Sequence, residues 1–324
     1  MLLEVSALQP AVKQLRTRVF SSSAELQMNG VNIAVVPVAG LGTRLLPATK
    51  SQPKEMLPVG RKPGVQYVVE ELTRAQMSQL LFITGPGKTS IENHFDLNNE
   101  LVQTLRETGK EELLEELEFE RAPLQFFYTR QRQLLGLGHA VLCAKPFVGK
   151  LPFVVALGDS IIGLHAQSDI VARMTHCFAS NQADAVIAFE PVPRNELHQY
   201  GVARPRTNGD VFALEDVIEK PAPHEAPSDL AVAARYVLSP KIFDALERTS
   251  PGKGGEIQLT DAIRLLIQEG GKVFGVRLKK GERRFDIGNY DAYFRAFVEF
   301  ALADEKYGQS LRDFLRRMLN EPHS

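Results

Sequence analysis

The chain has 324 residues, of which 44% are hydrophobic, and a formal net charge of −1. This size suits one large α/β domain or two closely joined ones, and the balanced charge argues against broad binding to nucleic acid or to anionic membranes. The two cysteines, Cys143 and Cys177, have the spacing of neither a disulfide framework nor a zinc site. Since no apolar run is long enough to span a membrane and no secretory signal pattern is visible, we expect a cytoplasmic protein.

An apolar run of strand length at residues 33–38 leads into a glycine-rich loop. The loop contains small residues and one arginine: Ala39, Gly40, Leu41, Gly42, Thr43 and Arg44. Glycines let backbone N–H groups approach an anionic oxygen, and the arginine adds a fixed positive charge. Lys54 follows ten residues later, and the prolines at positions 47, 53 and 58 exclude a regular helix. The stretch predicts a long cationic loop suited to phosphates.

The sequence of this loop also allows other interpretations. A strand followed by Gly-x-Gly, taken alone, is more often an ordinary connection between a strand and a helix. The loop also lacks the lysine of a GxxxxGK[ST] P-loop and the third glycine of a GxGxxG dinucleotide loop. The phosphate-binding hypothesis therefore depends on the whole phrase from residue 33 to residue 58.

Strand and helix patterns alternate through the first half of the chain. After the loop we expect a helix at 65–77, a strand at 80–84, mostly helix at 90–119, a strand at 124–129, a helix entered from Gly136 and a strand at 153–157. Alternation of this kind predicts a doubly wound, mostly parallel, Rossmann-like α/β sheet, whose ligands bind outside the carboxyl ends of the strands. The glycine-rich loop, Gln131 and Asp159 all follow strands there.

The second half carries a different pattern. Strands at 183–192, 200–204, 212–219 and 230–238 alternate enough to predict a smaller antiparallel lobe. They are followed by a helix starting within 256–266, a strand at 273–278, a tight turn at 285–289 and a helix at 290–302. Residues 305–319 have helical spacing and many charges, which indicates either a helix that mediates association or, the favoured alternative, a helix packed on the surface. No clean linker separates the halves.

GLGTR, PKEMLP, Gln131, Asp159 and the pair Glu219–Lys220 occur together in this order. The combination resembles the sugar-phosphate nucleotidylyltransferases, and among them the bacterial UTP–glucose-1-phosphate uridylyltransferases, from about residue 33 to about residue 300. The resemblance implies a nucleotidyltransferase domain at 32–303, a C-terminal helical tail at 304–324 and an N-terminal extension at 1–31. The extension has no counterpart in the family and is expected to be poorly ordered, with Met28 as a candidate start.

The resemblance also implies a reaction and its catalytic residues. A uridylyl group would pass from UTP to α-D-glucose 1-phosphate, giving UDP-glucose and pyrophosphate. Arg44 and Lys54 match residues that contact the triphosphate, and Lys220 matches a lysine between the nucleotide and sugar phosphates. Asp159 and Asp286 match the carboxylates that hold Mg²⁺, a cation that takes few protein ligands. Asp286 lies in the run Phe285-Asp286-Ile287-Gly288-Asn289, and an aspartate close to Gly-Asn is also common in turns.

Further matches concern substrate binding. Gln131 matches a residue that contacts the base, and Glu219 matches an acid that binds sugar hydroxyls. The remaining matched positions are backbone or pocket positions: Ala39, Gly40, Gly42, Thr43, Gly136, Tyr200 and Gly201. This chain departs from the family pattern at three positions, where Leu135 replaces a lysine, Ala234 a glycine and Gly158 a proline. His94, His139 and Cys143 are expected to be packed residues without a catalytic role.

The sequence leaves two alternatives to this function. One is a nucleotidylyltransferase for another nucleoside triphosphate or another sugar 1-phosphate, since Ala234 adds a methyl group where the sugar should approach. The other is a catalytically silent paralogue with a regulatory role, although Arg44, Lys220 and Asp159 are all retained. We expect a homo-oligomer that uses no nucleic acid or membrane partner.

Overall fold

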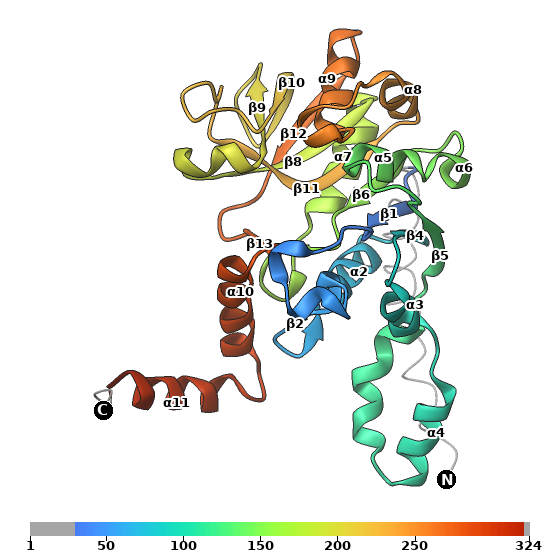
Figure 1. Cartoon of the computed structure of the whole chain (residues 1–324), viewed down its shortest axis with the longest axis vertical. Helices are drawn as coiled ribbons and strands as arrows, with labels where there is room; N and C mark the ends of the chain where they lie inside the picture. The colour runs from blue at the N-terminus through green and yellow to red at the C-terminus, as the bar shows by residue number, and fades with distance from the viewer. Residues whose placement is uncertain (1–29, 321–324) are drawn as a thin grey trace, which may run out of the picture.

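The computed structural model describes residues 30–320, and its centre is a nine-stranded sheet (Figure 1). In spatial order the strands are β5 (Gln125–Arg130), β4 (Gln79–Thr84), β1 (Ile33–Pro37), β6 (Phe153–Ala156), β11 (Leu230–Leu238), β8 (Ala185–Pro191), β12 (Val273–Arg277), β10 (Val211–Glu219) and β9 (Gly201–Pro205). Four neighbouring pairs are parallel and four are antiparallel.

Helices cover both faces of this sheet. One face packs against α2 (Gly64–Arg74), α3 (Thr89–Phe95) and α7 (Ile170–Asn181), and the other against α5 (Leu137–Leu142), α6 (Lys145–Val148), α8 (Lys241–Arg248) and α9 (Leu259–Gln268). Along β1, Ile33 and Val35 enter one core, whereas Ala34 and Val36 enter the other. Because strand side chains alternate between faces, a strand covered on both sides is apolar throughout. The doubly wound α/β prediction is confirmed.

The antiparallel strands of the second half continue the same sheet. β11 lies beside β6 of the parallel half and pairs on its other edge with β8. Its pairing with β8 is interrupted between Val232 and Tyr236 by a bulge. The buried guanidinium of Arg235 then reaches across to Glu71 of α2, 2.7 Å away. The smaller lobe that the sequence predicts is therefore hydrogen-bonded into the main sheet, as the absence of a clean linker suggested.

The stretch after β1 contains only short turns of 3₁₀ helix, as its prolines predict. These turns are η1 (Thr43–Leu45), η2 (Ala48–Lys50) and η3 (Lys54–Met56), and the small hairpin β2 (Pro58–Val59)–β3 (Lys62–Pro63) leads into α2. The predicted helical region near residues 90–119 consists of α3, α4 (Asn99–Glu107) and η4 (Glu111–Arg121). The other 3₁₀ turns are η5 (Leu164–Ala166), η6 (Arg194–Gln199) and η7 (Lys253–Gly255).

A second small sheet joins β7 (Ser160–Ile162) to β13 (Arg284–Asp286) in antiparallel fashion. The prediction of a turn over 285–289 is therefore wrong for Phe285 and Asp286, which pair with Ile161 and Ser160. Only the remainder forms the turn into α10 (Tyr290–Ala303). Phe300 of α10 packs into a separate core around this sheet.

The chain continues from α10 into α11 (Gly308–Asn320), which projects from the body in Figure 1. Of the residues in α11 only Gly308 is buried. The favoured prediction, a helix packed on the surface, therefore fits only the first turn of α11. The predicted extension at 1–31 lies almost entirely outside the described residues. None of the helices within residues 30–320 is long and apolar enough to cross a membrane.

Candidate active site

The glycine-rich loop leaves β1 at the carboxyl edge of the parallel strands. Gly42 has φ +68°, in the left-handed region that favours glycine. Its carbonyl oxygen accepts a hydrogen bond of 2.8 Å from Thr49 Oγ1. The side chain of Lys54 packs over Gly40: a Cβ placed on Gly40 would lie 4.0 Å from Lys54 Nζ. The loop therefore presents backbone and one ammonium group to the same space.

That space is a cavity of about 470 Å³ at the carboxyl ends of β1, β5 and β6. Eight of the residues predicted from the sequence line it: Ala39, Gly40, Gly42, Thr43, Lys54, Gln131, Gly136 and Asp159. They come from three separate connections of the fold. Parallel strands bring such connections to one edge of a sheet, where ligands of α/β folds bind.

One end of the cavity is fixed around Gln131, which is 4% exposed. Its amide Nε2 donates to the carbonyl oxygen of Gly136 at 3.0 Å and lies 3.0 Å from His139 Nδ1. Gly136 has φ +93°, and a Cβ there would lie 2.7 Å from Glu256 Cβ. Only glycine fits this position, and the Gln131 amide is held against it in a defined orientation.

At the other end Lys54 Nζ lies 2.5 Å from Asp159 Oδ2. The carboxylate raises the pKa of Lys54 above its ordinary value. Burial alone would raise the pKa of Asp159, but the Lys54 ammonium outweighs burial and holds that pKa below its usual range. The residue before this aspartate, Gly158, has no room for a side chain, since a Cβ there would lie 2.5 Å from Val38 Cγ1. Both groups are therefore charged at neutral pH.

Asp286 enters the same neighbourhood from β13. It pairs in register with Ser160, and the backbone N–H of Ile287 donates to the Asp159 carbonyl oxygen at 3.1 Å. Burial, and then the charge of Asp159, raises the pKa of Asp286. A carboxylate whose ionisation is disfavoured by a charged carboxylate beside it is suited to share a cation with that neighbour.

Arg44 and Arg284 surround this turn with positive charge. A Cβ placed on Gly288 would lie 3.0 Å from Arg44 Nη2, so the guanidinium of Arg44 packs against that glycine. Arg284 Nη1 lies 3.7 Å from Asp286 Oδ2, and its guanidinium carbon lies 4.4 Å from the centre of the Tyr200 ring. Tyr200 and Asp286 line a second cavity of about 610 Å³.

The remaining predicted residues belong to the β9–β10 hairpin. Glu219 pairs in register with Gly201, and its Oε1 lies 3.3 Å from Lys220 Nζ. The backbone N–H of Lys220 donates to the Tyr200 carbonyl oxygen at 2.9 Å. The backbone of Lys220 has φ +46°. A lysine in this conformation is strained, which is common at functional sites. Of this group only Tyr200 lines one of the two cavities; Gly201, Glu219 and Lys220 stand beside them.

The sequence missed a buried ion pair in the wall of the first cavity, which Glu55 lines. Glu55, next to Lys54, is 1% exposed, and its Oε2 lies 2.9 Å from Nζ of Lys88, which is 5% exposed. The position of Glu55 inside PKEMLP was an available signal, but its partner lies 33 residues away. Arg284 was missed as well, although it stands two residues before Asp286.

Asp159, which lines the first cavity, and Asp286, which lines the second, form a candidate magnesium site. No group of three or more His, Cys, Asp or Glu side chains suited to a metal occurs among the residues between 30 and 320. Mg²⁺ is usually bound by one or two carboxylates together with substrate phosphates and water. Asp159 and Asp286 are both half-buried and lie beside one another at the β7–β13 pair, where Asp286 pairs with Ser160, so they fit that requirement.

Comparison with known proteins gives a consistent result. The model of the nucleotidyl transferase family, described as "Nucleotidyl transferase", matches residues 33–302. The chain is 40% identical over 295 residues to a UTP–glucose-1-phosphate uridylyltransferase of Bacillus subtilis. The aligned region covers 91% of this chain and 99% of that protein.

Solved structures agree in fold. A UTP-bound UGPase from Acinetobacter baumannii is 40% identical and superposes with a TM-score of 0.79 over 88% of this chain and 98% of its own. A UDP-glucose pyrophosphorylase complexed with UDP-glucose is 35% identical, with a TM-score of 0.76 over 85% of this chain and all of its own. Both relatives match nearly their whole length.

Proposed function

The chain belongs to the nucleotidyl transferase family, and we propose that it transfers a uridylyl group from UTP to α-D-glucose 1-phosphate, giving UDP-glucose and pyrophosphate. The observation that carries this function is the single cavity into which the glycine-rich loop, Lys54, Gln131 and Asp159 converge. A base-reading amide stands at one end of that cavity, and a cation and a carboxylate stand at the other.

This reaction requires little general acid–base catalysis from the protein. An oxygen of the sugar phosphate, already an anion, forms a bond to the α-phosphorus of UTP, while the bond from that phosphorus to the leaving pyrophosphate breaks. The protein must align two phosphates and reduce their repulsion. We assign Arg44, Lys54 and the N–H groups of residues 39–43 to the triphosphate, and Lys220 to the region between the two substrates.

The base would be read by Gln131. Because its Nε2 is committed to the Gly136 carbonyl, its orientation is fixed before substrate arrives. With Nε2 turned toward Gly136 and His139, the amide would present its oxygen Oε1 as an acceptor to an N–H group on the uracil edge. Gly136 and the backbone of Ala39 and Gly40 would form the surface against which the nucleoside packs, since none of them places a bulky side chain in the cavity.

Mg²⁺ would be held by Asp159 and Asp286. When bound it would neutralise phosphate charge and orient the phosphate oxygens. The two aspartates supply hard oxygen ligands of the kind that this cation prefers, and Lys54 beside them supplies a further positive charge. A titration of activity against Mg²⁺ in chelated enzyme tests this assignment.

The sugar would bind along the β9–β10 hairpin. Glu219 and Lys220 are held together at 3.3 Å, so one carboxylate for hydroxyl groups stands next to one cation for the phosphate. Tyr200 and Gly201 would form the adjoining wall, where Arg284 stacks on the tyrosine ring. Ala234, at φ +57°, lies in the bulge of β11, the strand that pairs with β9 of this hairpin.

We also propose that residues 32–303 form the catalytic domain, that residues 304–324 form an accessory tail, and that the protein works as a homo-oligomer in the cytoplasm. These proposals rest on the continuous sheet, on the projecting α11 and on the sequence features described above. They are independent of the chemical assignment.

A coupled assay for pyrophosphate tests the function directly. Purified enzyme with UTP, glucose 1-phosphate and Mg²⁺ should release pyrophosphate and form UDP-glucose in equal amounts. Replacement of either substrate, one at a time, by other nucleoside triphosphates or sugar 1-phosphates separates the proposed enzyme from a relative of different specificity. A chain that binds UTP but releases no pyrophosphate with any sugar phosphate would instead be a silent regulatory paralogue.

A further inference from the structure

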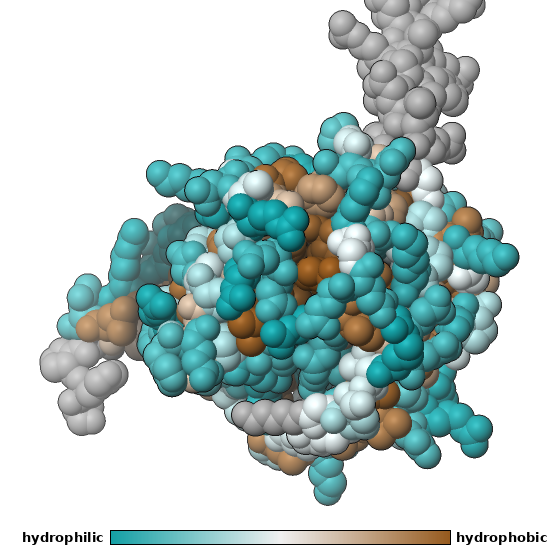
Figure 2. All heavy atoms as spheres, turned by 90° about the horizontal axis from the view of Figure 1, so that it is seen from above, coloured by the Kyte–Doolittle hydropathy of each residue, from teal (hydrophilic) through white to brown (hydrophobic). Residues whose placement is uncertain are grey.

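Two buried glutamines, Gln66 and Gln131, can be compared directly. Hydrophilic side chains cover most of the face seen in Figure 2, where water supplies hydrogen bonds. A buried amide instead needs protein partners for its nitrogen and its oxygen, or leaves one of these atoms for a ligand. Both glutamines are 4% exposed, and each contacts a histidine. Their hydrogen bonds nevertheless differ.

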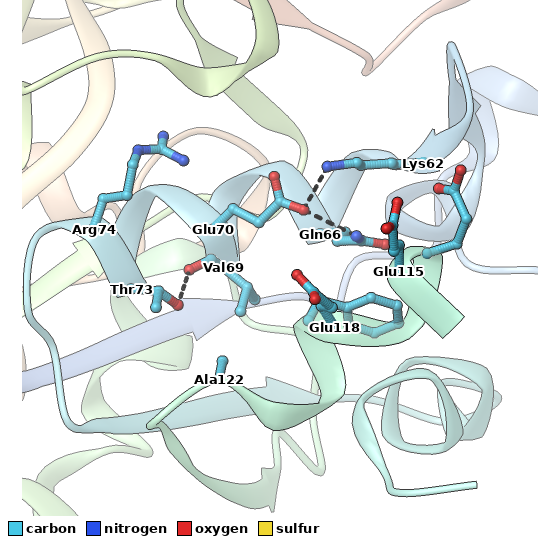
Figure 3. A pocket seen from close by; sticks show the side chains of 11 residues that line it. Lys62, Gln66, Val69, Glu70, Thr73, Arg74, Glu115, Glu118 and Ala122 are labelled. Atoms are coloured by element: carbon cyan, nitrogen blue, oxygen red, sulfur yellow. Dashed lines mark hydrogen bonds and ion pairs between the residues drawn. The ribbon is translucent and has the colours of Figure 1, made fainter. Parts of the chain in front are cut away.

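The amide of Gln66 is saturated within the protein. Figure 3 shows this side chain on α2 beside Glu70, and its Nε2 donates to Glu70 Oε1 at 2.9 Å. Its Oε1 lies 3.0 Å from Nε2 of His94. Because a carbonyl oxygen only accepts hydrogen bonds, the histidine is the donor. Both polar atoms of Gln66 are therefore used, and this glutamine has a structural role.

The amide of Gln131 uses only its nitrogen. That nitrogen donates to the Gly136 carbonyl oxygen and lies 3.0 Å from His139 Nδ1. Since an amide nitrogen only donates, Nδ1 is the acceptor, and the imidazole carries its proton on its other ring nitrogen. The amide oxygen Oε1 has no hydrogen-bond partner within residues 30–320 and is not one of the buried unpartnered atoms there. It is therefore open to the cavity that Gln131 lines.

His139 reaches this cavity only through the amide. It lies half-buried in α5 and is not one of the residues that line the cavity. The start of α5 is fixed, because the N–H of Gly138 donates to the carbonyl oxygen of Ile257 at 2.8 Å. The backbone of Gln131 is fixed as well, by a bond of 2.8 Å from its N–H to the Thr84 carbonyl oxygen. The imidazole therefore holds the amide from a rigid frame.

We propose that His139 is a positioning residue that selects uracil over cytosine by holding the Gln131 amide with its oxygen toward the base. The inference rests on the proposed function, because it places a pyrimidine nucleotide in the cavity. Oε1 accepts a hydrogen bond from the N3–H of uracil, whereas N3 of cytosine carries no proton and is itself an acceptor. A rotation that turned the amide nitrogen toward the base would break its bonds to both Gly136 and His139.

The first test measures the binding of UTP and of CTP to the full-length protein by calorimetry, with Mg²⁺ and without sugar phosphate. Wild type should bind UTP roughly 100-fold more tightly than CTP, since a site built to hydrogen-bond one group rejects an analogue that lacks it. His139→Leu removes the acceptor and should weaken UTP binding by about tenfold, the loss of one hydrogen bond. The preference for UTP over CTP should fall by a similar factor, because the amide can then rotate.

Three further variants separate positioning from packing. His139→Asn places an amide oxygen close to the position of Nδ1, so this variant should keep the wild-type preference. His94→Leu removes the histidine beside the saturated glutamine, Gln66, and is the matched control, which should also keep it. Gln131→Ala should lose the preference, and adding His139→Leu to it should have no further effect, because His139 acts only through this amide.

A second measurement needs no loss of the histidine. Nuclear magnetic resonance of the full-length protein with isotope-labelled histidine should show the His139 ring with a proton on Nε2 and none on Nδ1, and the spectrum of His139→Asn assigns the signal. A proton on Nδ1 would set a donor against the amide nitrogen and would overturn the proposal.

The binding results can contradict the proposal as well. A packing role for His139 would weaken UTP and CTP binding equally, so an unchanged preference in His139→Leu would overturn it, as would a wild-type protein without preference. The turnover of His139→Leu at saturating UTP should stay close to that of wild type, because His139 contacts no reacting atom. Since binding is measured without sugar phosphate, these results decide the role of His139 even if wild type releases no pyrophosphate, which would contradict the proposed function alone.

Discussion

The parallel half of the sheet (β5, β4, β1, β6) and the mainly antiparallel half (β11, β8, β12, β10, β9) contribute to the candidate site in different ways. Within the second, hereafter the antiparallel half, only β8 and β12 pair in parallel. In the parallel half, residues from three connections line one cavity because topology delivers them there. In the antiparallel half, Glu219 and Lys220 stand at the end of a hairpin whose conformation depends on local strain, with φ +46° at Lys220.

This difference predicts where the specificity for the nucleotide and the specificity for the sugar can change. A nucleotide pocket built on the ends of parallel strands is tied to the core and changes only with the fold. A sugar pocket built on a hairpin and on a bulge, with Ala234 at φ +57°, changes with single residues. We therefore expect variants in the parallel half to remove activity and variants in the antiparallel half to shift activity or specificity.

The largest effect should come from Asp159→Asn. An amide cannot replace the carboxylate charge at a hard cation, and the variant also deprives Lys54 of its partner at 2.5 Å. Turnover should fall by about 10³-fold or more, the loss expected for a preorganised electrostatic group, while the thermal unfolding temperature stays close to wild type. Asp210→Asn, on an exposed loop, is the matched control, and Mg²⁺-dependent turnover that survives in Asp159→Asn would return this residue to a structural role.

Lys220→Ala tests the hairpin of the other half. Removing a preorganised cation from the reacting phosphates should cost about 3 to 4 kcal/mol of transition-state stabilisation, a fall of roughly 10² to 10³ in kcat/KM. Steady-state kinetics beside Lys150→Ala, an exposed lysine far along the chain, gives the comparison. Near-normal turnover would exclude Lys220 from the reaction and would make the hairpin a purely structural element.

Glu71→Gln tests the buried ion pair that joins α2 to the antiparallel half of the sheet. Glu71 of α2 and Arg235 of β11 lie 2.7 Å apart and are both fully buried, so the variant leaves an uncompensated buried charge. The free energy of unfolding should fall by about 3 kcal/mol, measured by urea denaturation. Glu269→Gln, in an exposed pair with Arg248, should leave the free energy of unfolding almost unchanged, because exposed ion pairs contribute little to stability. Equal losses in the two variants would contradict a coupling role for Glu71.

Selectivity for the base should be modest between pyrimidines. A glutamine amide can pair with uracil or thymine, which differ by one methyl group, and a pocket supplies about 1 to 3 kcal/mol for such a difference. UTP should therefore be used first, dTTP detectably and purine nucleotides hardly at all, because a purine would clash or leave polar groups unpaired. Initial rates with four triphosphates measure this order, and an enzyme that runs best on ATP would overturn the assignment of Gln131.

The smallest effect should come from Ala234→Gly. The left-handed conformation costs a non-glycine residue about 1 to 2 kcal/mol, and glycine in a strand costs about 0.5 to 1 kcal/mol of entropy. The unfolding free energy should rise by about 1 kcal/mol or less, and KM for glucose 1-phosphate should fall if the methyl group narrows the sugar pocket. A destabilised variant with unchanged KM would show that the methyl group fills space in the core.

Much of the parallel half could be predicted because its signals are local. A buried strand followed by Gly-x-Gly gives the loop, and Lys54 follows within the same phrase. The pair Glu55–Lys88 could not be predicted, since burial of a charge depends on a partner 33 residues away. Strand alternation predicted β9, β10 and β11 but not their partners, so the sequence suggested a lobe where the structure has one sheet. The β7–β13 pair is too short to leave a pattern.

The central position of β11 has a consequence for how the protein is made. β6 is complete at Ala156, yet the strand that covers its free edge is Leu230–Leu238. On the ribosome, residues 157–229 must therefore emerge while a row of unpaired backbone groups on β6 stays exposed, a template for pairing with another chain. The first half cannot close as an independent unit during synthesis. We expect chains that stall before residue 238 to be the species that aggregate.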